Sequence, residues 1–427
     1  MTEYRLRHVA EINPPTPGFD RLASDQELTF LPMEAIWSGS RLDISQRRQK
    51  AAVITGYTRF QNGDVLVPKI TPTFEAGRSI LAEGLHNGVG AGSTELHVLR
   101  PGPNLDARFL LYLVNTHSFL KLGAAAMYGV AGQQRVPDNF LRDLTVRLPP
   151  TQEQRRIADF LDAETARIDE LASRRNAQLE LLSERFSTSI LLGITGANER
   201  GGRRYSGAAW LGSVPADWAV IPISYQFEVL LGKMLNQERV RGEHLKPYLR
   251  NTNVQWDCIT TNDLLMMDFP PEEQARYRLS TGDLLVCEGG EPGRAAIWDG
   301  EISEIYYQKA LHRVRPRSYS SSRWLFYCLR AATAQNVFAV EGNTTTIAHL
   351  TREQMNAHRF PFPARDTQDR ITSMLDDLSA QHKMAKESLS RQQTLLNERR
   401  CTLITAAVTG QIDVSTASGR AIEEELT

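Results

Sequence analysis

Cysteine and lysine are both scarce in this chain of 427 residues. Zinc sites and disulfide frameworks usually contain closely spaced cysteines, whereas the four here are far apart, so we interpret them as structural: Cys258, Cys287, Cys328 and Cys401. Only eight of the 49 basic residues are lysine, which leaves 49 − 8 = 41 arginines. The planar guanidinium of arginine matches phosphates and guanine edges, but a GC-rich genome also favours its codons. The arginine content alone therefore assigns no function.

Long apolar runs and an excess of one charge are also missing. No apolar stretch reaches the length of a membrane span, and the start MTEYRLRHVA lacks the apolar core of a signal peptide. We expect a cytoplasmic protein that does not contact membranes. The formal net charge of −1 provides no global attraction to nucleic acid. Any DNA-binding surface must then be local or be completed by a partner.

The residue patterns of common catalytic and metal sites are absent too. NPPT at Asn13 to Thr16 resembles the N-P-P-aromatic loop of adenine methyltransferases, but its fourth residue is threonine and too little sequence precedes it for a cofactor-binding strand. GVGAGST at Gly88 to Thr94 has no lysine where a phosphate-binding loop needs one, so we favour a turn between strands. No lysine has an acidic residue two positions earlier, and no H-x-H or H-E-x-x-H pair occurs. We therefore expect neither catalytic residues nor a metal site.

What the chain does contain is an internal repeat. QRRIADFLD begins at Gln154, and the related QDRITSMLD begins at Gln368, which is 368 − 154 = 214 positions later. The same offset holds through the long polar stretch that follows each copy. In the segments before the copies the offset drifts, since GDVLV at Gly63 recurs as GDLLV at Gly282. The pattern predicts a tandem duplication whose helices kept their length while the globular parts diverged.

Each half of the repeat reads as a globular segment followed by one long helix. Short β-rich runs such as DVLVPKI and DLLVC are separated by Gly, Pro and Asn, and each segment has one helical stretch, ARFLLYLVNT or SRWLFYCLRA. These features predict two α+β segments. No proline or glycine interrupts residues 151–192 or 367–408. Two helices of about 40 residues are expected, each about 60 Å long at 1.5 Å per residue.

Apolar residues recur in heptads along both predicted helices, with polar interruptions that argue against a long homogeneous zipper. We therefore expect the two helices to pair with each other as antiparallel coiled-coil helices. The residues expected to pack together are Ile157, Leu161 and Ile168 from the first helix and Leu389, Leu396 and Leu403 from the second.

Eight motifs, distributed over essentially the whole chain, carry a resemblance to a known family. They are FLPMEAI (30–36), KITPTFEAG (69–77), GSTELHVLRP (92–101), AGQQRVP (131–137), LPPTQEQRRIADFLD (148–162), WLGSVPADW (210–218), YLRNTNV (248–254) and AAVTGQIDV (406–414). Their order, together with the duplication, resembles the specificity subunit of Type I restriction-modification systems. The second helix opening, PFPARDTQDR, departs from the usual form of LPPTQEQRR.

This resemblance implies a domain organisation and a set of partners. Two pseudo-symmetric target-recognition domains would each read one half of a bipartite asymmetric DNA site, and the helices would fix the gap between the half-sites. The implied parts are target-recognition domain 1 (1–150), a central conserved helix (151–196), target-recognition domain 2 (197–364), a C-terminal conserved helix (365–412) and a tail (413–427). The implied partners are double-stranded DNA, two modification (methyltransferase) subunits and restriction (translocase and nuclease) subunits. The chain itself would be non-catalytic and bind no cofactor, with S-adenosylmethionine, ATP and magnesium used by the partners.

Base reading is expected from polar residues in loops between strands. In the first domain these are Lys69, Thr71, Thr73, Arg78, Ser93, Thr94, Gln133, Gln134 and Arg135. In the second they are Arg250, Asn251, Asn253, Glu288, Glu291, Arg294, Gln308, Lys309, Asn343 and Thr344. Each is also explicable as a solvated or turn-forming residue, and we expect only a minority to touch DNA. The triplet from Gln133 to Arg135 and Arg294 are favoured, because glutamine pairs bidentately with adenine and arginine with guanine or phosphate.

Glycines next to the favoured residues are expected to serve turns and close backbone approach: Gly132, Gly290 and Gly293.

Two other readings stay open from the sequence. A coiled-coil scaffold whose globular ends bind protein or peptide explains the helices without DNA, and it need not have arginine-lined concavities on both globular segments. The recognition subunit of an orphan DNA methylation system, without a nuclease, has the same sequence features and is distinguished only by neighbouring genes. The charged groups EQRR and NERR on the helices are explained equally well as exposed helix faces or as docking sites for partners.

Overall fold

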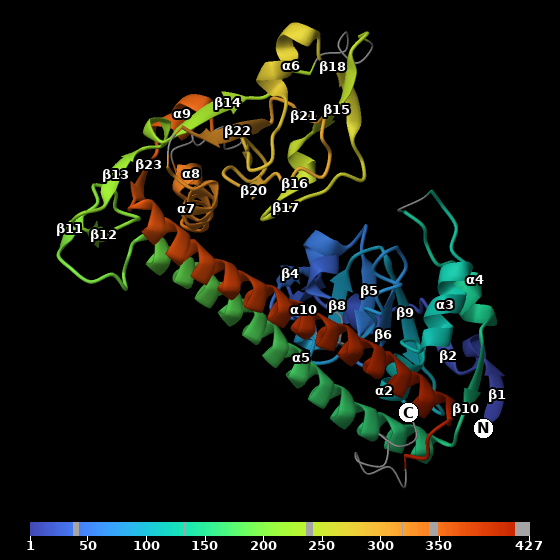
Figure 1. Cartoon of the computed structure of the whole chain (residues 1–427). Helices are drawn as coiled ribbons and strands as arrows, with labels where there is room; N and C mark the ends of the chain where they lie inside the picture. The colour runs from blue at the N-terminus through green and yellow to red at the C-terminus, as the bar shows by residue number, and fades with distance from the viewer. Residues whose placement is uncertain (37–41, 131–132, 236–241, 318, 341–348, 415–427) are drawn as a thin grey trace. The chain divides into compact units, whose positions relative to one another are not determined.

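The structure, a computed structural model, describes residues 1–36, 42–130, 133–235, 242–317, 319–340 and 349–414 (Figure 1). The chain forms two compact units, which we call unit 1 (Met1–Ala177 with Leu389–Thr427) and unit 2 (Gln178–Ser388). The boundary falls inside the two long helices, α5 (Thr151–Ile194) and α10 (Arg365–Thr409). Each unit therefore holds a globular part and one half of each helix. The predicted α+β class is confirmed, and the two predicted long helices are present.

Among the described residues of unit 1, most strands belong to two four-stranded sheets. The first has the order β2-β9-β6-β7 and is antiparallel: β2 (Ala10–Ile12), β9 (Leu96–Pro101), β6 (Val65–Pro68) and β7 (Ile80–Leu81). The second has the order β4-β3-β8-β5, with β3 and β8 parallel: β4 (Arg47–Gln49), β3 (Glu27–Leu31), β8 (Val89–Gly92) and β5 (Thr58–Gln61). A ribbon of β1 (Thr2–Arg5) and β10 (Thr145–Leu148) leads into α5. The short helices are α1 (Pro17–Arg21), α2 (Ala107–Leu113), α3 (His117–Ala125) and α4 (Asp138–Asp143).

Unit 2 repeats the strand order of the first sheet, and among its described residues the second sheet has three strands in place of four. Its antiparallel sheet has the order β14-β22-β19-β20: β14 (Phe227–Leu231), β22 (Leu311–Pro316), β19 (Leu284–Cys287) and β20 (Ala295–Ile297). A second sheet has the order β18-β15-β21, with β15 and β21 parallel: β18 (Leu265–Asp268), β15 (Leu245–Leu249) and β21 (Tyr306–Tyr307). The ribbons are β13 (Ala219–Pro222) with β23 (Arg359–Phe362), β11 (Arg203–Tyr205) with β12 (Ser213–Pro215), and β16 (Val254–Gln255) with β17 (Cys258–Ile259). The short helices are α6 (Pro271–Tyr277), α7 (Ser322–Ala334), α8 (Val337–Val340) and α9 (Arg352–Ala357). The predicted duplication is thus visible in the strand order of both units.

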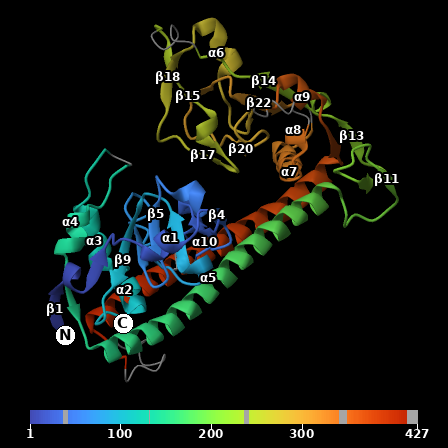
Figure 2. The same ribbon diagram turned by 180° about the vertical axis from the view of Figure 1, so that it is seen from behind.

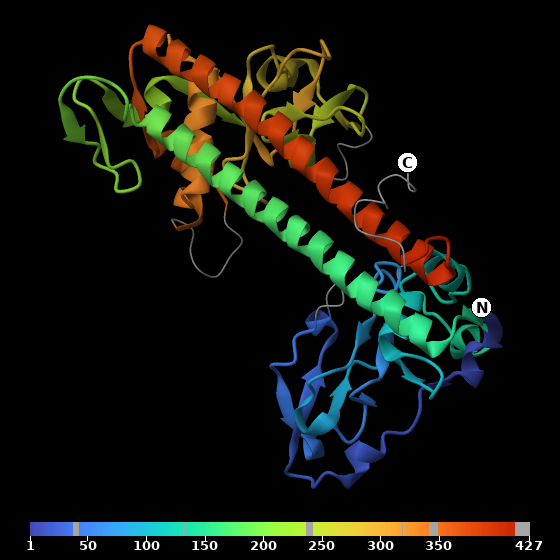
Figure 3. The same ribbon diagram turned by 90° about the horizontal axis from the view of Figure 1, so that it is seen from below.

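The long helices pair in each unit, as predicted (Figure 3). In unit 1 the first half of α5 lies against the last half of α10, and Ile157, Leu161 and Ile168 share one apolar core with Leu403. Leu396 packs against this core, whereas Leu389 is only half-buried. In unit 2 the end of α5 lies against the start of α10. Here Phe186 stacks on His382 with ring centroids 4.6 Å apart, and Gly193 leaves room for Ile371 and Leu375.

Two residues of the repeated motif join each helix to its globular part, which explains why the motif occurs twice. Gln154 accepts a hydrogen bond from the Asp106 amide (2.8 Å) and donates to the Asn104 and Pro149 carbonyls. Its equivalent Gln368 accepts from the Ser321 amide (3.0 Å) and donates to the Pro363 carbonyl. These buried amides satisfy backbone groups where α2 and α7 begin. Figure 2 shows α2 beside the start of α5 in unit 1.

The motif's aspartates make the second connection. The Tyr112 hydroxyl donates to Asp162 at 2.6 Å, and the Tyr327 hydroxyl donates to Asp376 at 2.6 Å. Burial raises the pKa of both tyrosines, and the adjacent carboxylates raise it further, so both stay protonated as donors. Each half of the chain therefore carries the same polar connection between helix and globular part.

A buried aspartate in each GDxLV motif pairs with an arginine of the neighbouring strand. The Asp64 side chain is only 1% exposed. Its carboxylate accepts hydrogen bonds from Nε of Arg100 at 2.7 Å and from a terminal nitrogen of Arg100 at 2.9 Å. The Asp283 carboxylate likewise accepts two hydrogen bonds from the guanidinium of Arg315. Gly63 and Gly282, with φ of 87° and 89°, provide the left-handed residue before each aspartate. This pair is a structural element common to both units.

Replacing Asp64 with alanine is expected to lower the free energy of unfolding by about 3 kcal/mol, because the largely buried Arg100 guanidinium loses its carboxylate partner. Urea unfolding followed by circular dichroism measures the loss. The matched control is Asp143→Ala, which removes an exposed ion pair with Arg7 and is expected to change stability by less than about 1 kcal/mol. Equal losses in the two variants would contradict the structural role assigned to Asp64.

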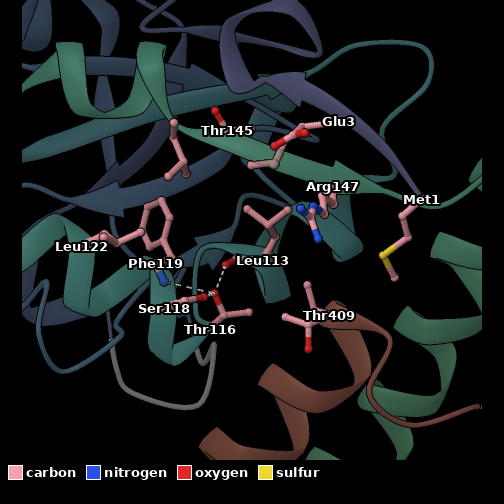
Figure 4. A pocket seen from close by; sticks show the side chains of 13 residues that line it. Met1, Glu3, Leu113, Thr116, Ser118, Phe119, Leu122, Thr145, Arg147 and Thr409 are labelled. Atoms are coloured by element: carbon pink, nitrogen blue, oxygen red, sulfur yellow. Dashed lines mark hydrogen bonds between the residues drawn. The ribbon is translucent and has the colours of Figure 1, made fainter.

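The two ends of the described chain meet in unit 1. A cavity of about 310 Å³ lies between the β1–β10 ribbon, the start of α3 and the end of α10, and Figure 4 shows Met1 and Thr409 at its rim. Thr116 caps α3 there, accepting from the Phe119 amide and donating to the Leu113 carbonyl. The first strand and the end of the last helix thus belong to one folded unit.

The cysteines divide into two kinds. Cys287 and Cys328 are buried, in agreement with a structural role, and burial raises the pKa of both thiols. Cys258 and Cys401 are exposed and contribute nothing to a core, so the structural interpretation was wrong for these two. Within the part of the chain that the structure describes, no helix has the length and apolarity needed to cross a membrane.

Candidate nucleic-acid interface

Five of the residues predicted in the first globular segment come together at the end of β6. The Lys69 ammonium donates to the Thr94 carbonyl at 3.0 Å, and the Thr71 amide donates to the Gln134 carbonyl at 3.1 Å. The Val136 amide donates a hydrogen bond to the Lys69 carbonyl at 2.9 Å, which places Arg135 beside the end of β6. Three segments far apart in sequence therefore form one polar group of side chains.

Arg135 is held in a defined orientation by Glu95. Its Nε and a terminal nitrogen donate to the two carboxylate oxygens at 2.9 and 2.7 Å. This hydrogen bonding lowers the pKa of the Glu95 carboxyl, so the pair stays ionised at neutral pH. Arg135 remains 40% exposed. Its remaining donors are therefore accessible to an incoming acceptor.

Two cavities adjoin at Lys69. The first, of about 390 Å³, is lined among others by Lys69, Thr94, Tyr128 and Arg135. The second, of about 410 Å³, is lined by Lys69 together with the NPPT loop and Arg59. Lys69 thus lines two hollows in the surface at the end of β6.

The predicted glutamines, Gln133 and Gln134, directly precede Arg135 beside this surface. Backbone bonds in both directions between Tyr128 and Arg135, at 3.2 and 2.9 Å, close the base of the loop that carries them. Gly129 has φ of 123°, and a Cβ there would lie 2.9 Å from the Gln133 carbonyl, so only glycine fits. Tyr128 is 63% exposed, and Gln133 is also exposed. Gly132 lies outside the described residues.

The other predicted residues of this segment occupy turns. Thr73 and Arg78 are half-buried, and the Arg78 amide donates to the Thr73 carbonyl at 3.4 Å. The Ser93 hydroxyl accepts from the Glu95 amide at 3.2 Å and so shapes the turn that presents Thr94. Ser93 thus shapes the turn beside Lys69, whereas Thr73 and Arg78 close a turn of their own.

The two motifs that resemble catalytic loops have structural explanations. Asn13 has φ of 51°, and its side chain accepts from the Val98 amide at 2.9 Å and donates to Asp138 at 3.0 Å, so the NPPT segment is a linking loop. The turn expected within GVGAGST is wrong for its first part, because Val89–Gly92 forms strand β8. A Cβ on Gly90 would lie 2.2 Å from the Phe60 ring, so its glycine serves strand packing.

Two buried histidines that the sequence did not single out cross-link these regions. His97 Nε2 lies 2.9 Å from the Val136 carbonyl, and its equivalent His312 lies 2.7 Å from the Leu350 carbonyl. Burial lowers the pKa of both imidazoles, so each is neutral and donates its Nε2 proton to the carbonyl. The recurrence of LHVLRP as LHRVRP was the sequence signal for this pair.

In unit 2 the predicted residues also come from loops that meet at strand ends. Asn253 is fully buried, accepting from the Arg250 amide at 2.9 Å and donating to Asp263 at 2.6 Å. Its amide is therefore occupied within the loop and not presented to solvent. Arg250 forms an ion pair with Asp263 on the outside of the same loop.

A second loop joins the first through Arg294. This guanidinium donates to the Asn251 carbonyl at 3.0 Å and lies 3.6 Å from the Glu291 carboxylate. The Trp256 indole donates to the other oxygen of Glu291 at 2.9 Å. The expected turns are present, with φ of 78° at Gly290 and 91° at Gly293. Arg294 therefore joins two predicted loops, although its side chain is only 16% exposed.

The third loop of unit 2 lies at the end of β21. The Gln308 amide donates to the Leu249 carbonyl at 3.1 Å, which places Gln308 next to the start of the Arg250 loop. Lys309 is exposed, and the Glu288 amide donates to the Ala310 carbonyl at 3.0 Å. The remaining predicted residues, Asn343 and Thr344, lie outside the described residues.

Neither polar group contains a recognisable metal site. Throughout the described ranges, no three His, Cys, Asp or Glu side chains converge in a way that could hold a metal ion. The donors are instead arginine, lysine, glutamine and threonine at loop tips. These are the side chains that bind phosphates and base edges.

Comparison with known proteins gives a consistent assignment. The sequence matches the family described as Type I restriction modification DNA specificity domain twice, over residues 3–181 and 215–391. The EcoAI and EcoEI Type I restriction enzyme specificity subunits of Escherichia coli are 41% and 38% identical to it over 156 residues, or 36% of this chain. These alignments span only 26% and 25% of the two relatives. A putative Type I restriction enzyme specificity subunit, MjaX, of Methanocaldococcus jannaschii is 22% identical over 341 residues, covering 77% of this chain and 75% of the relative.

Solved structures share the fold. A chain from a study of complex assembly and conformational transition of the type I R-M system matches with a TM-score of 0.73 and 17% identity, covering 95% of this chain and 97% of that one. The HsdS subunit from Thermoanaerobacter tengcongensis matches with a TM-score of 0.52 and 17% identity, covering 96% and 97%. Because the family match covers most of the sequence in two copies, the chain belongs to the Type I restriction-modification specificity subunit family.

Proposed function

We propose that this chain is the DNA-reading subunit of a Type I restriction-modification system, with residues 1–150 and 197–364 as its two target-recognition domains. Each domain reads one half of a bipartite, asymmetric site in double-stranded DNA. The helices at 151–196 and 365–412 act as the spacer that sets the gap between the half-sites. The last part of this division is the predicted tail, 413–427, of which residues 415–427 lie outside the described residues.

One observation carries this proposal: the two units share a scaffold but differ in the side chains at its loop tips. The sheets β2-β9-β6-β7 and β14-β22-β19-β20 have the same order. After β6 the chain presents Lys69, next to Arg135 and the exposed Gln133, whereas after β19 it presents Glu288, followed by Glu291 and Arg294. A common framework with different hydrogen-bonding groups is what two readers of unlike half-sites require.

Catalysis is assigned to partners. Two modification subunits supply methyl transfer from S-adenosylmethionine, and restriction subunits use ATP and magnesium for translocation and cleavage. The near-neutral charge of the chain supports this division, because partner subunits would supply much of the phosphate clamp. The chain itself contributes sequence recognition.

The test is methylome sequencing of cells that express the cognate modification subunit with and without this chain. We expect one bipartite asymmetric motif to be methylated only when the chain is present. The purified chain alone should transfer no methyl group to DNA. Methylation that persists without the chain, or methyl transfer by the chain alone, would overturn the proposal.

A further inference from the structure

Arginine side chains flank a small apolar core on one face of the sheet β4-β3-β8-β5. That core consists of Phe19, Leu28, Phe30, Val53, Val89 and Ala91. Arg48 lies directly opposite Leu28, and Arg59 lies directly opposite Ala91. Directly paired residues of adjacent strands project to the same side of a sheet, so both arginines lie on the face of this core. Because β4 and β5 are the outer strands, the two guanidinium groups lie at opposite edges of that face.

Aromatic rings hold these cations in place. The Arg48 guanidinium lies 3.7 Å from the centroid of the Phe30 ring and donates to the Tyr57 hydroxyl at 3.2 Å. The Arg59 guanidinium lies 4.1 Å from the centroid of the Phe19 ring. Stacking on a ring orders a guanidinium without using its edge N–H groups, and one of these groups of Arg59 donates to the Ile54 carbonyl. Both side chains are therefore pre-oriented before any ligand binds.

Carboxylates neutralise this face only weakly. Within the described part of the chain, the carboxylate paired with Arg48 or Arg59 is Asp20, which is 67% exposed and lies 3.6 Å from Arg59. Lys50 donates to the backbone carbonyls of Asp20 and Leu22, at 3.0 and 2.6 Å. Three cations thus lie around one small core, and Asp20 is the carboxylate that forms an ion pair with them among the described residues. Such an arrangement favours an external anion.

The face is continuous with the candidate interface. Arg59 and Tyr57 line the cavity of about 410 Å³ that also contains Lys69. Lys69 in turn lines the neighbouring cavity with Arg135. Arg59, Lys69 and Arg135 are thus linked through two neighbouring cavities, whose linings also include the acids Asp20, Glu95 and Asp138.

We infer that Arg48 and Arg59 bind phosphates of the DNA backbone next to the half-site read by unit 1. This inference rests on the proposed function and adds two contacts that were not among the predicted residues. Phosphate contacts fix the register of a protein on the duplex without reading bases. Arg48 and Arg59 would accordingly position the Gln133 to Arg135 loop, while base selection stays with that loop.

The test uses the complete complex of this chain with its modification subunits and measures DNA affinity as a function of salt concentration. The variant is the double substitution Arg48→Gln with Arg59→Gln, and the control is Arg7→Gln with Arg147→Gln, which removes the same charge from exposed arginines elsewhere in unit 1. Each phosphate contact contributes about 0.9 to the slope of log affinity against log salt. The slope of the double variant should be shallower than that of wild type by about 1.8. Raising the salt from about 50 to about 200 mM should therefore weaken DNA binding by a factor about ten times smaller in the double variant than in wild type. The control should keep the wild-type slope.

Two further measurements separate phosphate binding from a structural role. The methylated sequence should stay unchanged in the double variant, because phosphate contacts carry no base information. Arg48→Lys should keep most of the slope, because lysine still binds phosphate as a point charge after the stacking is lost. An unchanged slope with a lowered melting temperature would mean that the arginines only stabilise the sheet, and would overturn the inference. If the wild-type complex itself showed no sequence-specific binding, the proposed function would fail instead.

Discussion

Inserting one heptad into α5 after Ala177 and one into α10 after Ser388 is expected to move methylation from the original target to one with a longer gap. These residues are the last of their units on each helix. Because the helices are antiparallel, a paired insertion at this boundary preserves the packing of Ile157 with Leu403 on one side and of Phe186 with His382 on the other. Seven residues add about 10 Å at 1.5 Å per residue, or about three base pairs at 3.4 Å each.

Methylome sequencing with the cognate modification subunit measures this result. We expect methylation at the original target to fall to background and the new motif to keep both half-site sequences. The control is the same heptad inserted into α5 alone, which puts the apolar stripe out of register with α10 and should abolish methylation. A change in the bases read, with the gap unaltered, would rule out the helices as the spacer.

Replacing Gln133, Gln134 and Arg135 with alanine is expected to relax or abolish recognition of one half-site. Each good bidentate base contact that is lost should reduce discrimination by about 1 to 3 kcal/mol. The exposed Gln133 is free to approach a base edge, whereas Arg135 is already bonded to Glu95 and offers its remaining donors. The other half-site and the gap should be unchanged, because the proposed function assigns them to unit 2 and to the helices.

The single variants and a reciprocal variant make this test specific. Gln133→Ala should alter base preference with little effect on stability, whereas Arg135→Ala also removes the partner of Glu95 and should lower the melting temperature. Gln308→Ala in unit 2 is the reciprocal control and should affect only the second half-site. The measurement is methylome sequencing of each variant, together with thermal unfolding of the purified chain. If Gln133→Ala and Gln308→Ala changed the same half-site, separate reading by the two units would be refuted.

Several expectations about individual residues needed the structure to be decided. Asparagine is a residue type that can read bases, but Asn253 is buried and forms hydrogen bonds within its own loop. Gly90 suggested a turn, yet it lies in a strand because the Phe60 ring occupies the space of its side chain. Arg48 and Arg59 lie in none of the sequence motifs described above. Their place beside Phe30 and Phe19 follows from strand pairings that no local pattern encodes.

The sequence by itself determined the duplication, the two long helices, the α+β class and the family. These follow from local periodicity, from the absence of proline and glycine over each helix, and from motifs repeated at a constant offset, all of which are properties of short segments. Only the tertiary structure decided which polar side chains are exposed to solvent and which form hydrogen bonds inside the protein. Lys69, Thr94 and Arg135 meet because hydrogen bonds close loops between distant strands, and hydrogen-bond geometry at a few ångströms cannot be read from spacing along the chain.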